Sequence, residues 1–146
     1  FGSGRYADVE YECLMKDDVV VMAAPSYVRE HGPFDTVQDL ERTKLLRSPL
    51  EPWRTWFAAH DLDWPEPNEG SSFNDIGLMC DAAAQSLGVA LVRPKLGAPW
   101  IENGTLVRLF EREVPSPHAH YLCWRTGAMD RWECASFAEW LKRVVK

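Results

Sequence analysis

Hydrophobic positions near the start of the chain follow two different patterns. Residues 9–15 alternate between apolar and polar side chains, which predicts a half-buried strand. Residues 19–24 are apolar without interruption, and such a run is typical of a strand that is covered on both faces of a sheet. The polar Lys16-Asp17-Asp18 separates the two predicted strands.

Helical signals follow in the next stretch. Pro25 opens a short helical turn that ends at Gly32-Pro33, because proline is tolerated in a first helical turn. Thr36 and Asp39 have the spacing of a capping arrangement for a second short helix. A third helix begins at Pro52, and its apolar stripe has spacings of three and four residues. That stripe consists of Trp53, Trp56 and Phe57.

Two longer helices are predicted further on. One runs from about Asp75 to Leu87, with Asn74 or Asp75 as its N-cap. Its residues are apolar on almost all sides, so we expect part of it, around Leu78 and Met79, to meet a partner subunit. The other is the last segment of the chain, where Glu139, Lys142 and Arg143 are expected to face water. Its apolar stripe consists of Phe137, Trp140, Leu141 and Val144.

Short apolar segments between these helices predict the remaining strands, at residues 45–46, 89–92, 106–110 and 118–124. Residues 62–70 and 93–99 are expected to be loops, the second with at most a helical turn. Because strands and helices interleave, the pattern predicts an α/β fold with a layered, partly parallel sheet.

Composition narrows the class of protein. Of the 146 residues, 46% are hydrophobic and 26% are charged, which is typical of a globular domain and not of a disordered chain. The net charge of −6 and the absence of a Lys/Arg run argue against a free-standing module that binds duplex DNA. No segment has the length of a membrane span, no signal-peptide pattern is present, and the missing initiator Met suggests a fragment.

The reactive side chains do not form a known catalytic motif. The four cysteines match no CxxC pair or zinc template, so reduced thiols in a cytoplasmic protein are expected, with no cofactor and no metal. A metal site from His118, His120 and Cys134 is the weaker alternative, because a strand with one polar face has the same spacing. Cys123 and His120 lie on opposite faces of their predicted strand, so we do not expect an enzyme.

Two segments instead suit ligand binding. Residues 23–26 and 71–74 both run from an extended stretch into a helix start, where free N–H groups attract anions and serine hydroxyls can donate hydrogen bonds. For Ser72 and Asn74, simple N-capping is the alternative interpretation, and capping does not exclude contact with a ligand.

The order of these segments resembles the effector-binding domain of LysR-type transcriptional regulators, in the branch that includes the glycine-cleavage and β-lactamase regulators. The matching phrases are Phe1-Gly2-Ser3-Gly4-Arg5-Tyr6, Ala24-Pro25-Ser26-Tyr27-Val28, His31-Gly32-Pro33 with Asp39-Leu40, Leu45-Leu46, Trp53-Arg54-Thr55-Trp56-Phe57, Ser72-Phe73-Asn74-Asp75 with Gly88-Val89-Ala90-Leu91, Gly104-Thr105-Leu106-Val107, and Pro115-Ser116-Pro117 before Tyr121-Leu122. Together they cover nearly the whole chain.

The resemblance implies a two-lobed fold like that of type 2 periplasmic binding proteins, with a small effector between the lobes. It implies that residues 19–114 form the second lobe, and that residues 1–18 and 115–146 belong to an incomplete first lobe and its hinges. The helix-turn-helix that would bind DNA lies outside this sequence. The family assembles as homodimers or homotetramers, and no membrane contact is implied.

The resemblance also implies where the effector binds. Its contacts in the family cluster at positions that match Ser72, Phe73 and Asn74, at Tyr121, and near the hinge at Phe1. An amino acid or organic acid is the expected kind of effector. A solute-binding protein of the same fold is the alternative function, and an enzyme on that fold is a more distant one.

Overall fold

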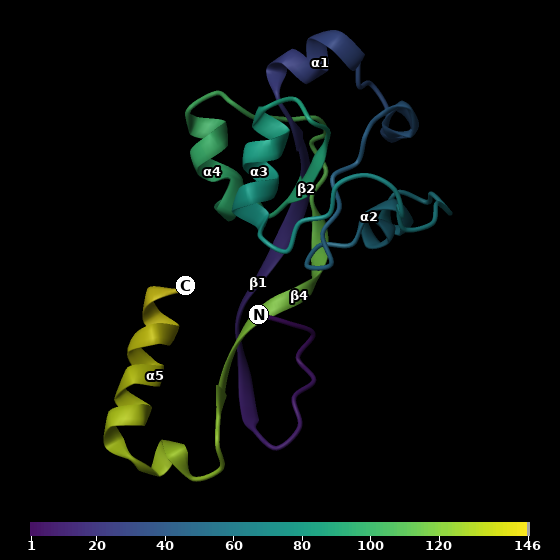
Figure 1. Cartoon of the computed structure of the whole chain (residues 1–146). Coiled ribbons are helices and arrows are strands. Elements are labelled where there is room, and N and C mark those ends of the chain that lie inside the picture. Colours follow the sequence, from purple (N-terminus) through teal and green to yellow (C-terminus); the bar gives the residue numbers. More distant parts are fainter. Residues whose placement is uncertain (146) are drawn as a thin grey trace. The chain divides into compact units, whose positions relative to one another are not determined.

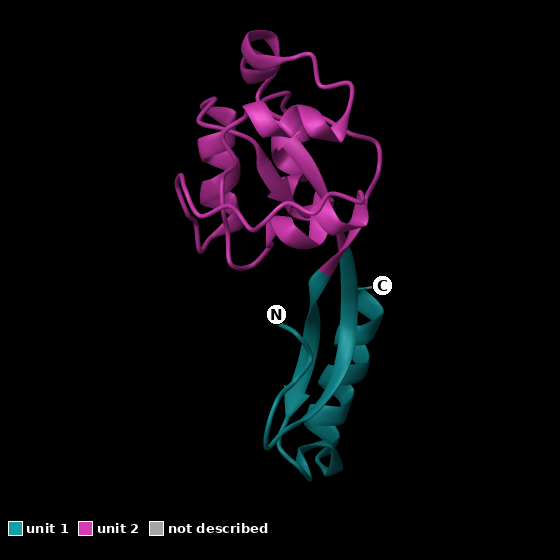
Figure 2. Ribbon diagram, turned by 90° about the vertical axis from the view of Figure 1, so that its right-hand side faces the viewer, with its two compact units in different colours: residues 1–17, 117–146 teal, residues 18–116 magenta. Residues whose placement is uncertain are grey.

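The computed structural model describes residues 1–145 of the chain (Figure 1). Its elements are β1 (Glu10–Ala23), α1 (Pro25–His31), the 3-10 helix η1 (Val37–Arg42), α2 (Trp53–Ala59), α3 (Ile76–Ala84), β2 (Ala90–Val92), α4 (Pro94–Glu102), β3 (Val107–Arg108), β4 (Val114–Trp124), the 3-10 helix η2 (Ala128–Asp130) and α5 (Trp132–Val144). They form two compact units (Figure 2). Unit 1 holds Phe1–Asp17 and the chain from Pro117 onward, and unit 2 holds Asp18–Ser116.

The two predicted strands at the start are one continuous strand, β1, which spans 14 residues and passes from unit 1 into unit 2. The polar residues 16–18 do not interrupt it, because strand hydrogen bonds are made by the backbone and β1 pairs with β2, β3 and β4. Burial changes along the strand as the pattern predicted. Side chains before Val19 are exposed or half-buried, and those from Val19 to Ala23 are buried.

The sheet of unit 2 is mixed. β2 and β3 both pair with β1 in antiparallel fashion, with Val21 opposite Leu91 and Met22 opposite Arg108. Two further segments add parallel bridges, from Leu45 to Val89 just before β2 and from residue 47 to residue 72. The predicted α/β class is confirmed.

Side chains of β1 point alternately into two cores, which explains why its second half is apolar throughout. One core contains Val19, Val21, Ala23, Tyr27, Leu40, Trp53, Trp56 and Phe57. The other contains Val20, Met22, Ile76, Met79, Cys80, Ala83 and Leu106. Helix α2 therefore covers one face of the sheet, and α3 covers the other (Figure 1). The predicted stripe of α2 is buried, and the indole of Trp53 also donates to the Leu46 carbonyl oxygen at 2.8 Å.

Two helices differ from the prediction. Residues 94–102 form α4 where a loop was expected, because Pro94 occupies a first-turn position that needs no N–H donor and Gly97 packs closely against Met22. Helix α3 ends at Ala84, three residues before the predicted end, and Ser86 takes a left-handed conformation with φ 61°.

The apolar surface of α3 is divided between the core and solvent. Met79 is buried in the core of this chain, so the expectation that it meets a partner subunit is wrong. Leu78 is 59% exposed and remains available for such a contact.

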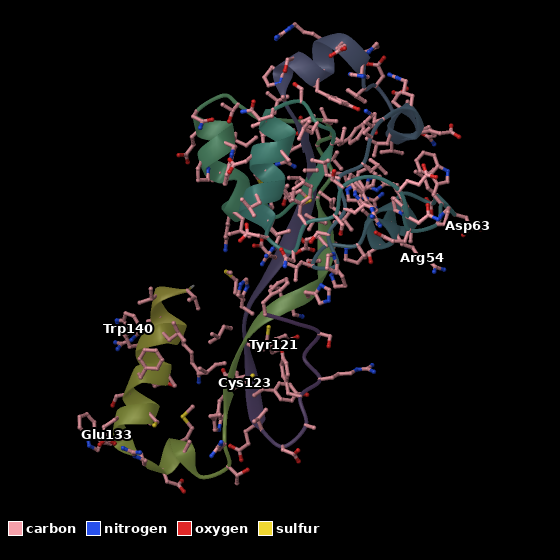
Figure 3. All side chains as sticks on the ribbon, viewed as in Figure 1. Arg54, Asp63, Tyr121, Cys123, Glu133 and Trp140 are labelled. Atoms are coloured by element: carbon pink, nitrogen blue, oxygen red, sulfur yellow. The ribbon has the colours of Figure 1, made fainter. Side chains whose placement is uncertain are left out.

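Helix α5 presents to solvent the face that the sequence marked as apolar. Phe137 and Val144 are exposed, and Trp140 points away from β4 (Figure 3). The helix packs instead through the small, buried Ala138, and Lys142 pairs with Glu12 at 2.7 Å. The expectation that Lys142 simply faces water is therefore wrong.

Candidate functional site

The segment before α3 is held firmly by its backbone. The Arg47 N–H donates to the Ser71 carbonyl oxygen at 3.0 Å, and the Arg47 carbonyl oxygen accepts from Phe73 N at 2.8 Å. Asp75 is the N-cap of α3, and its Oδ1 accepts from Leu78 N at 3.0 Å. Of the two caps that the sequence left open, Asp75 is the correct one.

The predicted residues at this helix start differ in burial. Phe73 is half-buried and packs against the second core, whereas Ser72 and Asn74 are exposed. Within residues 1–145, neither the Ser72 hydroxyl nor the Asn74 amide makes a side-chain hydrogen bond. Both groups are therefore open to a ligand, and neither is the N-cap.

The chemistry of this helix start favours a ligand with both a donor and an acceptor group. The N–H groups of the first turn, the Ser72 hydroxyl and the Asn74 amide suit a carboxylate. The Asp75 carboxylate lies at the same place and adds a negative charge, which suits an ammonium group.

A buried ion pair lies close to the carboxyl end of β2, and the sequence interpretation missed it. Arg93 follows β2 directly, and its Nε lies 3.0 Å from Glu51 Oε1. Ser116 Oγ donates to the other Glu51 oxygen at 2.7 Å. The two charged side chains are 6% and 0% exposed. The only sequence signal is a charged residue at the end of an apolar strand, which does not identify its partner.

Tyr121 lies in a group of aromatic side chains in unit 1 (Figure 3). Its ring centroid is 5.7 Å from that of Tyr6 and 5.9 Å from that of Tyr11, both edge to face. Gly4 has φ +76°, and a Cβ there would lie 2.5 Å from the Tyr121 hydroxyl oxygen, so glycine is required. Partial burial raises the pKa of Tyr121, and Cys13 and the two tyrosines raise it further. The phenol therefore stays protonated and can donate a hydrogen bond.

Phe1 lies on a different side of β4 from Tyr121. Gly2 pairs with Ala119 through two backbone hydrogen bonds of 3.0 and 2.9 Å, which places the Phe1 ring 4.9 Å from His120 and 43% exposed. Residues 120 and 121 point to opposite faces because strand side chains alternate. Phe1 and Tyr121 thus belong to unit 1, and the Ser72 segment belongs to unit 2.

Other kinds of site find little support in the described part of the chain. Within residues 1–145, no three His, Cys, Asp or Glu side chains are grouped as a metal ion would require, so His118, His120 and Cys134 do not form such a group. The four cysteines are free, with Cys80 buried and Cys13 and Cys123 exposed. None of the described helices has the length and apolar character needed to cross a membrane.

A family model and several related sequences agree on the family to which this chain is similar. The family model described as "LysR substrate binding domain" matches residues 1–146. An uncharacterized HTH-type transcriptional regulator, y4mQ of Sinorhizobium fredii, is 32% identical over 94% of this chain and 50% of its own length. The activator AmpR of Pseudomonas aeruginosa is 31% identical over 99% and 48%. The glycine cleavage system transcriptional activator of Escherichia coli is 25% identical over 97% and 47%. The chain spans about half the length of these relatives.

Solved structures agree with this result. The effector domain of AmpR from Pseudomonas aeruginosa superposes with a TM-score of 0.84 at 25% identity, over 99% of this chain and 69% of that one. The regulatory domain of CrgA from Neisseria meningitidis, at 13% identity, shows the fold alone, with a TM-score of 0.76 over 99% and 74%. Effector domains of this type have the periplasmic-binding-protein-like fold, so the predicted fold class is confirmed.

Proposed function

Because the chain belongs to the LysR substrate-binding domain family, we propose that it senses a small metabolite for a DNA-binding transcription regulator. The observation that carries this proposal is the match of the family model along the whole sequence, together with the fold shared with an AmpR effector domain. The relatives are transcriptional regulators, and we propose that this chain likewise binds its metabolite without converting it.

We propose that residues 19–114 are the second lobe of the effector domain, and that residues 1–18 and 115–146 are parts of the first lobe and its hinges. The division of the chain into units supports this, because the chain passes between them only at β1 and β4. The coverage of 69% of the AmpR effector-domain chain is consistent with an incomplete first lobe.

We propose that Ser72, Phe73 and Asn74 of unit 2, and Phe1 and Tyr121 of unit 1, are residues that contact the effector. The open hydroxyl and amide at the start of α3 support it, as does the protonated phenol of Tyr121. The nearby carboxylate of the N-cap favours an amino acid as the effector, since its ammonium group offsets that charge.

The proposed mechanism is a shift between two arrangements of the lobes. A ligand changes this equilibrium only through its different affinity for the two arrangements. In the whole regulator, a homodimer or homotetramer in the cytoplasm, the change would reach a helix-turn-helix domain outside this sequence. The exposed Leu78 on α3 is the position of this chain that we propose for a subunit contact.

A thermal-shift screen tests the effector site. The whole regulator is tested against the L-amino acids and against carboxylic acids of two to six carbons, because a ligand that binds the folded state raises its stability. We expect at least one amino acid to raise the melting temperature. Ser72→Ala and Tyr121→Phe should each reduce that rise, whereas Ser136→Ala, on the exposed surface of α5, should not. A rise that both site variants retain in full would place the site elsewhere.

A further inference from the structure

Unit 2 contains a pocket of about 590 Å³ whose lining does not include Ser72, Phe73 or Asn74. Its apolar wall and its rim of opposite charge come from two chain segments and from the turn after α3. The residues that matter here are Leu45, Leu46, Pro67 and Leu87 in the wall, and Lys44 and Glu69 on the rim. This volume lies in the range of small-molecule sites, which is roughly 300–1,000 Å³.

The pocket and the α3 helix start lie at different ends of short parallel segments within unit 2. Residues 45–47 run parallel to the strands that contain Val89 and Ser72. The pocket is lined by residues at the beginning of these three parallel segments, and α3 starts beyond the end of one of them. Ser71 lines the pocket and Ser72 does not, so the two places adjoin in the sequence but use different residues.

The walls of the pocket are fixed in place. The Arg47 guanidinium donates to the Gly70 carbonyl oxygen at 2.9 and 3.3 Å, which holds the loop that carries Glu69. Earlier in the same loop, the Glu66 carboxylate accepts from Trp53 N at 3.1 Å and from Arg54 N at 2.7 Å. These two hydrogen bonds anchor the loop to the start of α2. Because the loop is already held in place, little of its own conformational entropy is lost when a ligand binds.

The opposite wall is anchored as well. Lys44 N donates to the Tyr27 hydroxyl at 3.0 Å, and Thr43 Oγ1 donates to the Leu40 carbonyl oxygen at 2.8 Å. These bonds hold the backbone of Lys44 and leave its ammonium group free to meet a ligand at the rim.

The two charges on the rim are available. Lys44 and Glu69 are both exposed, and among the described residues neither takes part in an ion pair. A cation and an anion above an apolar wall complement a molecule that carries both charges and an apolar group. We infer that this pocket binds a small zwitterion with apolar side chains, of the size of one or two amino-acid residues. Lys44 would contact its carboxylate and Glu69 its ammonium group.

An NMR titration of this chain tests the inference with four probes. L-leucine and leucyl-leucine carry both charges, whereas 4-methylpentanoate lacks the ammonium group of leucine and isoamylamine lacks its carboxylate. We expect both zwitterions to give saturable shifts of the Leu45, Gly70 and Leu87 amides. The two singly charged analogues should bind at least about tenfold more weakly, because each loses one charge-assisted contact.

Variants separate a specific site from general surface binding. Lys44→Met and Glu69→Gln should each weaken the binding of leucyl-leucine by about tenfold or more. Lys95→Met and Glu102→Gln remove the same charges from exposed positions outside the pocket and should have no effect. The inference is overturned if the shifts do not saturate, if they occur only at residues 72–75, or if Lys44→Met binds as tightly as Lys95→Met. Shifts at residues 72–75 alone would leave the proposed effector site standing.

Discussion

Replacing Arg93 with Met tests how strongly unit 2 depends on its buried ion pair. The methionine keeps an unbranched apolar stem of similar reach but removes the guanidinium from Glu51, whose side chain is 0% exposed. The carboxylate retains the hydrogen bond from Ser116 Oγ but loses the opposite charge 3.0 Å away. A buried carboxylate without its countercharge is strongly unfavourable.

The free energy of unfolding that Arg93→Met should lose follows from the burial of both partners of the ion pair. Removing one partner of a buried pair costs about 3–5 kcal/mol, because the remaining charge stays buried without its countercharge. A domain of this size has a total stability of roughly 5–15 kcal/mol, so the loss is a large fraction. The double variant Glu51→Gln/Arg93→Met should lose less than the sum of the single variants, because it leaves no isolated charge.

Urea unfolding followed through the amide signals of Val21 and Leu91 measures this loss in unit 2 itself. Arg108→Met is the matched control, because Arg108 pairs with Glu113 at 2.9 Å but the two side chains are 35% and 42% exposed. Exposed pairs contribute about 0–1 kcal/mol. If Arg93→Met costs no more than Arg108→Met, the buried pair does not stabilise the unit as we have argued.

Three further expectations follow from single side chains. Cys80 should resist a thiol reagent at pH 8 while exposed Cys13 reacts, because burial raises the pKa of the Cys80 thiol to about 11; equal labelling rates would contradict this. The Thr36 backbone N–H lowers the pKa of Asp39 below its ordinary value of 3.8, so the stability that Asp39→Asn removes should be present above that pH and be lost as the pH falls through the lowered pKa; a difference that does not decrease as the pH falls below 3.8 would argue against it. Asp75→Ala should cost about 1 kcal/mol in urea unfolding, as expected for a helix N-cap, and no measurable cost would show that the cap is dispensable.

Periodicity identified much of the fold because most of the core of unit 2 lies on regular elements. The uninterrupted apolar run of residues 19–24 predicted a strand covered on both faces, and the spacing of Trp53, Trp56 and Phe57 predicted the buried face of α2. The capping box of Thr36 and Asp39 is also present. These signals depend on residues close together in the chain, which is why they could be read without a structure.

The remaining features depend on contacts between distant residues. The spacing of residues 137–144 marked an apolar stripe on α5, but the helix packs through Ala138 because its neighbours in unit 1 select the face. The pairing of Glu51 with Arg93 joins two loops that no local pattern connects. For the effector site, the sequence identified the open groups at Ser72 and Asn74, and the family resemblance drew attention to Tyr121. Their assembly into one site stays a prediction.

The most direct test of an effector-sensing role is the affinity of the whole regulator for its promoter DNA, measured by fluorescence anisotropy with and without each L-amino acid. We expect one amino acid to change the DNA dissociation constant by about 5-fold or more, and the DNA to change the affinity for that amino acid by the same factor, since coupling between two sites is reciprocal. Ser72→Ala/Tyr121→Phe should reduce this coupling, and Ser136→Ala should preserve it. A DNA affinity that no amino acid or small carboxylic acid changes, or a coupling that the double variant retains in full, would contradict the account.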